Sequence, residues 1–198
     1  MKQFLLESIQ TVLLVMAVFI PLQSCFVNFQ VAGSSMQPSL QPNQYVLVNK
    51  VVYADMLGSL ARRYGIDIDS GPGDIRHWLF SHEPRRGEII VFQTPNSPDR
   101  FLVKRIVGMP GDTVAFSAGV LFINGHHLEE LYLPDSYQTS QPGLDMRPLK
   151  VGDHEYFVMG DNRHSSVDSR FLGPIPRKLI TGKAFFIYWP FQNFGLIR

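Results

Sequence analysis

The sequence predicts a mainly β fold, a barrel-like domain preceded by one N-terminal transmembrane helix. No Asp, Glu, Lys or Arg occurs between Ser8 and Asn49, and the segment Val12–Ile20 within the first half of this stretch is apolar on all sides. The rest of the chain holds short runs of β-branched and aromatic residues with period two, bounded by turn residues. The 16 glycines and 14 prolines punctuate the 198 residues without reaching the share typical of disordered chains.

The apolar segment Ile9–Val31 predicts the transmembrane helix. As a helix it would be about 34 Å long, and the hydrocarbon core of a membrane is about 30 Å thick. Lys2 favours an N-terminus on the inside of the cell (plasma or inner) membrane. We therefore expect residues 1–31 to be a membrane anchor and residues 32–198 an extracytoplasmic domain. A cleaved signal peptide and a buried core helix are the alternative interpretations of the apolar segment.

The remaining chain predicts short strands of the kind found in β-barrels and sandwiches. Residues 54–64 instead repeat their apolar positions at helical spacing, within an insertion at about 53–83. Residues 133–150 are polar and predict a loop. The strand-like segments, in chain order, are Gln44–Val52, Glu88–Thr94, Arg100–Val107, two strands within Asp112–Asn124 with a turn at Ser117–Gly119, Glu155–Gly160 and Lys183–Trp189.

Composition excludes several classes of function. The net charge is +1, so no strong field attracts nucleic acid, and we expect no nucleic-acid partner. One cysteine excludes a disulfide framework and any multi-cysteine zinc site. The six histidines form no HExxH motif, and no phosphate-binding or dinucleotide-binding glycine motif occurs. We expect neither a metal nor an organic cofactor.

Two residues are candidates for nucleophilic catalysis. Ser35 follows Gly33-Ser34 directly after the apolar segment, and glycine permits the sharp geometry that presents a hydroxyl. Lys104 alternates with Arg105 in the strand-like segment Phe101–Val107, so the two side chains fall on opposite faces. Only the lysine can lose its proton and act as a base, and it does so when burial lowers its pKa. His164 with Asp168 is the alternative base.

The combination of motifs closely resembles bacterial type I signal peptidases, also called leader peptidases. The resemblance covers about residues 4–50 and 84–190. It rests on four stretches in the family's order: Ser35-Met36, Arg86–Phe92, Val103–Asp112 (VKRIVGMPGD) and Met159–Arg170 (MGDNRHSSVDSR).

The resemblance implies a role for each matching residue. Ser35, and not Ser34, matches the nucleophile, and Lys104 matches the general base of a Ser-Lys dyad. Ser166 matches a serine that hydrogen-bonds the lysine amine. The supporting and cleft positions are Asp168 and Arg170 as a charged pair, Asp161, Asn162 and Arg163 as the rest of that box, and Met36 and Leu102 beside the substrate cleft.

The resemblance also implies the reaction. The expected function is a membrane-bound serine endopeptidase that removes signal peptides from secreted preproteins, cleaving after Ala-x-Ala through an acyl-enzyme. An extended strand such as Glu88–Thr94 would pair with the substrate, so that its −1 and −3 side chains enter the enzyme and −2 faces outward. Preproteins, membrane lipid and the protein translocation machinery are the expected partners. A non-catalytic membrane-tethered β-domain of a secretion complex, or a homologue dedicated to a single substrate, are the alternatives.

Two positions depart from the family's pattern or extend it. The oxyanion is expected at the backbone N–H of Ser35, but Gly33 stands where part of the family has a serine hydroxyl as second donor. A second backbone N–H or a water is the expected replacement. Near the end of the chain, the aromatics of Tyr188–Phe191 are candidates either for the lipid interface or for the end of a core strand.

Overall fold

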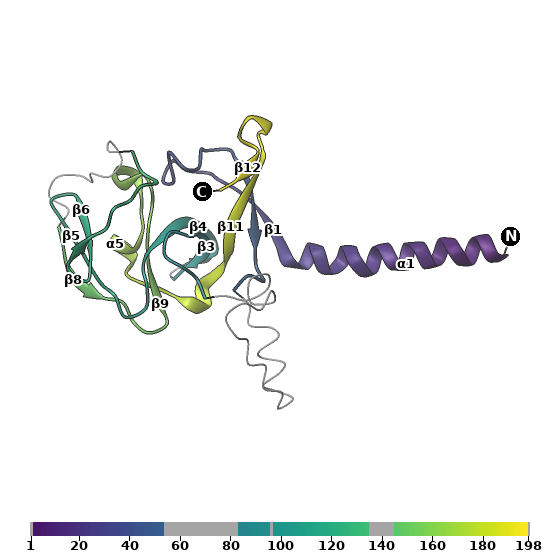
Figure 1. Cartoon of the computed structure of the whole chain (residues 1–198), viewed down its shortest axis with the longest axis horizontal. Helices are drawn as coiled ribbons and strands as arrows, with labels where there is room; N and C mark the ends of the chain where they lie inside the picture. The colour runs from purple at the N-terminus through teal and green to yellow at the C-terminus, as the bar shows by residue number, and fades with distance from the viewer. Residues whose placement is uncertain (1, 54–82, 96, 135–144, 198) are drawn as a thin grey trace, which may run out of the picture.

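The computed structural model describes residues 2–53, 83–95, 97–134 and 145–197, which form a mainly β body with a projecting helix (Figure 1). Two antiparallel sheets make up the body. The predicted helical segment 54–64 lies outside the described residues. The elements in chain order are α1 (Lys2–Cys25), β1 (Phe26–Gln30), β2 (Tyr45–Asn49), β3 (Ile89–Thr94), β4 (Ser97–Gly108), β5 (Thr113–Ser117), β6 (Val120–Ile123), β7 (His126–His127), β8 (Met146–Lys150), β9 (Glu155–Met159), η1 (Arg163–Ser165), α5 (Ser169–Leu172), β10 (Ile175–Pro176), η2 (Arg177–Leu179), β11 (Ile180–Trp189), η3 (Phe191–Asn193) and β12 (Gly195–Leu196).

The large sheet has the strand order β1-β2-β11-β3-β4-β9-β10, with β12 added to β11. The predicted barrel is not found. Within the described residues the order begins at β1 and ends at β10, and no pairing joins these two edge strands to close the sheet. The strand β10 has only two residues, which pair with β9. The open sheet therefore leaves strand edges that would be paired with each other in a closed barrel.

The small sheet has the order β7-β6-β5-β8 and contains the predicted hairpins. Ala118 and Gly119 turn between β5 and β6 with φ of 48° and 83°, and Asn124 and Gly125 turn between β6 and β7 with φ of 53° and 82°. The polar segment predicted as a loop is partly wrong, because Met146–Lys150 forms β8 and pairs with β5. Its strand has mostly exposed side chains, so no buried alternation marked it in the sequence.

The N-terminal segment also differs from the prediction. The helix α1 ends at Cys25, and Phe26–Gln30 is a strand that pairs residue by residue with Tyr45–Asn49. The predicted span Ile9–Val31 is therefore too long at its distal end, since its last residues complete a sheet. Within the part of the chain that the structure describes, no helix is both long enough and apolar enough to cross a membrane.

Three apolar clusters hold the body together. One lies beneath β1, β2 and the loop between them, one lies around β3, β9 and β11, and one joins the small sheet to β9. In the third cluster Phe157 of β9 packs with Val114 and Phe116 of β5, all buried. Each such side chain contributes about 1.5–3 kcal/mol on burial. The small sheet is thus anchored on the strand that leads into the Met159–Arg170 motif.

Candidate active site

Ser35 lies in the loop between β1 and β2, which we call the nucleophile loop (residues 31–44). The loop is closed at its base, where the N–H of Val31 donates to the carbonyl oxygen of Gln44 at 2.8 Å. Met36 and Leu40 are buried in the core beneath it, and the N–H of Leu40 donates to the carbonyl oxygen of Met36. Ser35 is thereby held half-buried beside a core anchor.

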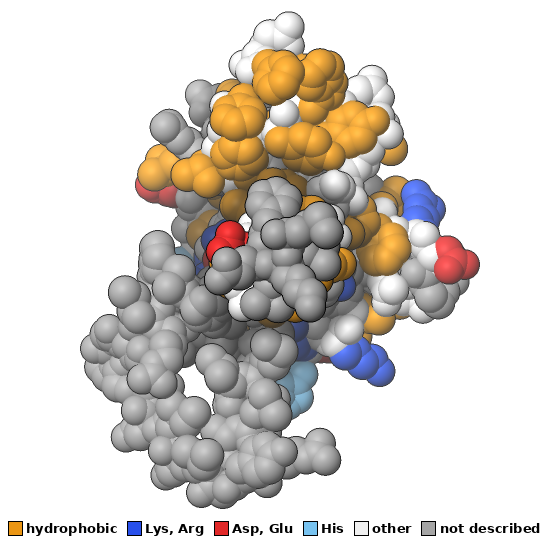
Figure 2. Space-filling view, turned by 90° about the vertical axis from the view of Figure 1, so that its right-hand side faces the viewer, with side chains coloured by type: hydrophobic (Ala, Val, Ile, Leu, Met, Phe, Trp, Pro, Cys, Tyr) orange, Lys and Arg blue, Asp and Glu red, His pale blue; other side chains and the backbone are white. Residues whose placement is uncertain are grey.

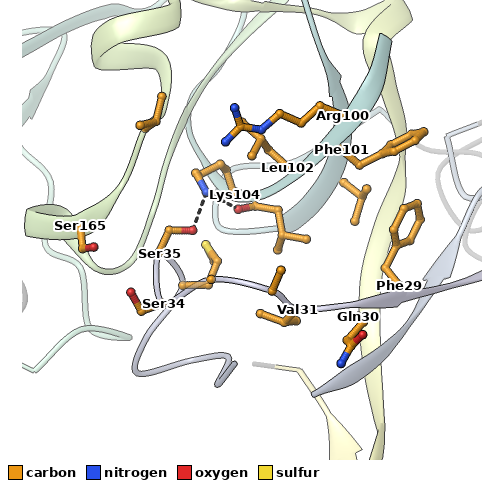
Figure 3. A pocket seen from close by; sticks show the side chains of 16 residues that line it. Phe29, Gln30, Val31, Ser34, Ser35, Arg100, Phe101, Leu102, Lys104 and Ser165 are labelled. Carbon is orange, nitrogen blue, oxygen red and sulfur yellow. Dashed lines mark hydrogen bonds between the residues drawn. The ribbon is translucent and has the colours of Figure 1, made fainter. Parts of the chain in front are cut away.

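Lys104 reaches Ser35 from the middle of β4 (Figure 3). The strand is paired with β3 at this point, Ile90 standing opposite Lys104. The Nζ of Lys104 donates to Ser35 Oγ at 2.7 Å and to the carbonyl oxygen of Val103, also at 2.7 Å. Although charged at its tip, the Lys104 side chain is among the largest fully buried ones, only 2% exposed. The structure thus brings together the two residues predicted as nucleophile and base.

Burial lowers the pKa of Lys104 from 10.5 to about 8, because the ammonium form loses its hydration. The carboxylates of Asp168 and Asp161 oppose this shift, and the guanidinium groups of Arg100 and Arg170 add to it. A substantial fraction of the lysine is therefore neutral at mildly alkaline pH, which is the form that accepts a proton.

Ser166 is buried near the same place, but its predicted hydrogen bond to Lys104 is not formed. Within the described residues Ser166 Oγ has no hydrogen-bond partner. The serine packs tightly on Gly160, where an added Cβ would collide with the Ser166 side chain and with the carbonyl oxygen of Ser35. Gly160 therefore permits both the nucleophile loop and Ser166 to approach its Cα closely.

The residues after β9, Gly160–Arg163, form a turn that we call the support turn. The backbone N–H of Asn162 donates to the carbonyl oxygen of Ser35 at 3.0 Å. The Asn162 side-chain amide donates to the carbonyl oxygen of Ser34 at 3.2 Å. The support turn thus holds the carbonyl groups on both sides of the Ser35 Cα.

Asp168 and Arg170 form the predicted pair, with two contacts of 2.8 Å between guanidinium and carboxylate. Asp168 also accepts the N–H of Gly160 at 2.9 Å and caps the short helix α5. The Asp168 carboxylate thus bonds Arg170 and Gly160 of the support turn. His164, the alternative base, is exposed at η1. The geometry accordingly favours Lys104 as the partner of Ser35.

Two further ion pairs beneath the site were not predicted. Arg105 donates to both oxygens of Asp161 at 2.9 and 2.8 Å, and also to Ser39 Oγ in the nucleophile loop at 3.1 Å. Arg163 forms a second two-pronged pair with Glu130. Alternation had placed Arg105 on the face opposite Lys104, but both faces are buried. A buried arginine requires a carboxylate, and spacing alone cannot identify which one.

A cavity of about 580 Å³ opens beside Ser35 and Lys104. It lies between the end of β1 with the nucleophile loop and the outer edge of β4 (Figure 3). Both predicted cleft residues, Met36 and Leu102, line it. The other lining residues are the predicted catalytic and oxyanion positions Gly33, Ser35 and Lys104, with Phe29–Ala32, Ser34, Val91, Arg100, Phe101, Val103, Ser165 and Val167.

The edge of β4 that faces this cavity is unpaired. Along the described residues, β9 pairs with β4 only from Arg105 onward, and Ser97 and residues 101–104 are paired on the β3 side alone. The predicted substrate-pairing strand Glu88–Thr94 is unsuitable, because β3 is paired on both sides, with β4 and β11. The available edge for an extended peptide is therefore β4 before Lys104.

No group of three or more histidine, cysteine, aspartate or glutamate side chains within the described residues is arranged to hold a metal ion. The adjacent His126 and His127 lie exposed on β7.

Comparison with known proteins identifies the class. A family model described as signal peptidase, peptidase S26, matches residues 4–189. Signal peptidase I S of Bacillus subtilis is 36% identical over 175 residues, which cover 85% of this chain and 79% of that protein. Signal peptidase I of Leptolyngbya laminosa is 32% identical over 200 residues, covering 96% and 83% of the two chains. The chain belongs to the signal peptidase family, peptidase family S26.

Within that family the similar proteins are of the type I class. A probable signal peptidase I-2 of Synechocystis is 34% identical over 173 residues. The aligned region covers 84% of this chain and 65% of that protein's length. A crystal structure of a signal peptidase I from Enterococcus faecalis aligns with a TM-score of 0.44 at 31% identity, covering 52% of this chain and 97% of that one.

The close packing at Gly160 predicts a sharp effect of one methyl group. Gly160→Ala should lower peptidase activity by about 100-fold, because the new Cβ displaces Ser35 or Ser166 and small misplacements at a reacting centre have effects of this size. The matched control is Gly152→Ala, whose Cβ meets the flexible end of the Glu155 side chain. The measurement is kcat/KM on a preprotein for the two folded variants. Equal activities would contradict the packing argument.

Proposed function

We propose that this chain is a membrane-bound serine endopeptidase that removes signal peptides from secreted preproteins, with Ser35 as nucleophile and Lys104 as general base. One observation carries the proposal: a lysine amine, 2% exposed, lies 2.7 Å from a serine hydroxyl at the floor of an open cavity. Membership of the signal peptidase family supports the substrate class.

The chemistry follows from the position of the amine. Neutral Lys104 accepts the proton of Ser35 Oγ as that oxygen attacks the carbonyl carbon of the scissile bond. The tetrahedral intermediate then breaks its C–N bond. The leaving amine accepts the proton from Lys104 and departs as the new amino terminus, and an ester to Ser35 remains. A water then loses its proton to Lys104, attacks the ester and releases the carboxylate with Ser35 Oγ protonated again.

The developing oxyanion is stabilised at the nucleophile loop. The backbone N–H of Ser35 supplies one donor, and losing one such donor typically costs about 2.7–4 kcal/mol in the barrier. Gly33 lines the same cavity, and a Cβ built there meets nothing within 4 Å. The position therefore accommodates a water or a second backbone donor in place of a side-chain hydroxyl.

Ser166, Asp168 and Arg170 support the base. The Ser166 hydroxyl is buried and unsatisfied within the described residues, so it is available to bond the Lys104 amine once the amine is neutral. Arg170 neutralises Asp168, whose carboxylate otherwise raises the pKa of Lys104. Arg170 thereby offsets part of the stabilisation that the Asp168 carboxylate gives to the charged form of the lysine.

The substrate binds as an extended strand on the free edge of β4. Main-chain hydrogen bonds to this edge give affinity, and alternate side chains point the same way, so residues −1 and −3 face the enzyme. Apolar groups including Met36, Val91 and Leu102 line the cavity. These neighbours favour small residues such as alanine at both positions.

Membrane attachment is assigned to α1 and a nearby aromatic patch. Several apolar side chains of α1 are exposed, including Leu13 and Leu14, and the helix projects from the body (Figure 1). The aromatic patch consists of Trp189, Phe191 and Phe194, all exposed, with the ring of Phe191 in contact with each of the other two. Figure 2 views the face from which α1 projects, and apolar side chains gather there above the helix. With α1 as the anchor, we expect the active site at the extracytoplasmic membrane surface.

The dyad is tested by removing each partner. Ser35→Ala and Lys104→Met should each reduce cleavage of a preprotein to background, and Lys104→Arg should do the same because arginine keeps its proton. The measurement is gel-based cleavage by purified protein with unfolding curves as the folding control. Appreciable cleavage by Lys104→Arg would overturn the assignment of the base.

The depressed pKa of Lys104 predicts the pH profile. Protonated Lys104 cannot accept the serine proton, so kcat/KM should rise with pH through about 8 and level off above it. A histidine base would place the rise near about 6.5. The profile is measured for the parent and for His164→Ala. A rise near the histidine value that disappears in His164→Ala would contradict the proposal.

Specificity is tested with a panel of preproteins varied at −1, −2 and −3. Leu or Phe at −1 should block cleavage because the cavity floor is already filled by core residues, and a charged residue buried there unpaired is costlier still. Bulky residues at −2 should be accepted, since that side chain faces outward. Equal sensitivity at −1 and −2 would refute the extended-strand binding mode without touching the Ser35–Lys104 chemistry.

Membrane attachment is tested by alkaline carbonate extraction of the full chain from expressing cells. The parent protein should stay with the membranes. The double variant Leu13→Lys, Leu14→Lys should be released, since each charge in the hydrocarbon region costs about 2.5–3.5 kcal/mol. Leu131→Lys is the matched control, because it makes the same change at a leucine of the body that is 91% exposed. Release of the parent protein would exclude α1 as an anchor.

A further inference from the structure

Glu130 and Tyr132 have no role in the reaction described so far, yet they contact the two buried arginines beneath the active site. Both belong to residues 128–133, which leave the small sheet after β7 and which we call the support segment. Glu130 is 5% exposed and its carboxylate is gripped by the guanidinium of Arg163, which is 3% exposed. One of the two contacts is 2.6 Å, and the second is shorter.

The support segment also reaches the second buried arginine. The hydroxyl of Tyr132 donates to Glu130, and its ring lies 4.0 Å beneath the guanidinium carbon of Arg105. Arg105 in turn holds both oxygens of Asp161. The support segment therefore contacts two arginines: Arg163, which belongs to the support turn, and Arg105, which pairs with Asp161 of that turn.

The support turn transmits this hold to the nucleophile. Besides binding Glu130, Arg163 donates through Nε to the carbonyl oxygen of Gly160 at 3.1 Å. Between these two residues, Asn162 donates its backbone N–H to Ser35 and its side-chain amide to Ser34. The contacts run without a break from the small sheet to the backbone of the reacting serine.

We propose that Glu130 and Tyr132 are positioning residues of the peptidase, through which the small sheet holds the support turn against Ser35. The inference rests on the proposed function, because a nucleophile must exist for its position to matter. A two-pronged arginine–carboxylate pair fixes orientation as well as distance. Apolar packing at this place would be non-directional, and buried ion pairs are often replaceable without loss of stability.

The first test compares two neighbouring glutamates. Glu130→Gln removes the buried charge and gives Arg163 an amide donor in place of an acceptor, whereas Glu129→Gln makes the same change at an exposed position. In full-length protein with Ser35 intact, Glu130→Gln should lower kcat by about 10- to 100-fold with little change in KM, because the geometry of the reacting groups is disturbed. Glu129→Gln should match the parent. A Glu130→Gln enzyme with parental kcat per folded molecule overturns the proposal.

A milder variant covers the case in which Glu130→Gln fails to fold. Tyr132→Phe keeps the ring under Arg105 and removes only the hydroxyl that bonds Glu130. The Glu130 carboxylate then loses one hydrogen bond but keeps its contacts with Arg163, so kcat should fall by only a few-fold. Circular dichroism and melting temperature report the folded fraction. A Tyr132→Phe protein that melts earlier but keeps parental kcat shows a structural role alone and overturns the proposal.

The route is tested with Asn162→Ala, which removes the side-chain bond to Ser34. If the support segment acts through the support turn, the losses of kcat in Tyr132→Phe and Asn162→Ala should combine to less than their product. Multiplicative losses would contradict the route. The proposed function is judged separately, by whether the parent loses its cleavage on Ser35→Ala, so its failure is distinguishable from the failure of this inference.

Discussion

The whole site depends on one constraint: an amine must stay buried next to carboxylates without forming an ion pair with any of them. A carboxylate in direct contact would hold Lys104 protonated, and a protonated lysine cannot serve as a base. The structure meets the constraint by giving nearby carboxylates to arginines. Asp168 is paired with Arg170 and Asp161 with Arg105, each through two contacts, which leaves the hydroxyl of Ser35 as the side-chain partner of the amine. Arginine suits this task because it never competes for the role of base.

These pairs also fix the backbone on which catalysis relies. Asp168 holds the N–H of Gly160, Arg105 reaches Ser39, and Asn162 of the same turn holds Ser35. The contacts that pair the carboxylates near Lys104 with arginines therefore also hold the backbone around Ser35 in position. Gly160 stands where they converge, and its missing side chain lets three segments of backbone and side chain meet at van der Waals distance. A site assembled in this way tolerates little displacement.

Much of this arrangement was predictable from the sequence, for identifiable reasons. Alternation along β4 separated Lys104 from Arg105, and elementary acid–base chemistry selected the lysine. Hairpin turns at Gly119 and Gly125 were marked by their residue types. The partner of Arg163 was beyond reach, because Glu130 lies 33 residues away and only the tertiary fold joins them. The open sheet, the strand Phe26–Gln30 and the strand Met146–Lys150 were not predicted for a related reason: pairing depends on what lies across the sheet, and neither of these two strands carries a clear alternation of its own. The hydroxyl of Ser166, expected on Lys104, shows that a motif specifies proximity more firmly than it specifies a hydrogen bond.

The strand β4 changes its neighbours within its own length, since its outer edge is bare up to Lys104 and covered by β9 from Arg105 onward. A bare edge accepts any polypeptide whose main chain is extended and whose own hydrogen-bonding groups are unsatisfied. Segments already inside a helix or a finished sheet have no such groups to offer. Under the proposed binding mode, the cleft discriminates by conformation before it discriminates by side chain. A preprotein would be open to cleavage while its cleavage region is still unfolded, and folding would withdraw the rest of the protein from attack.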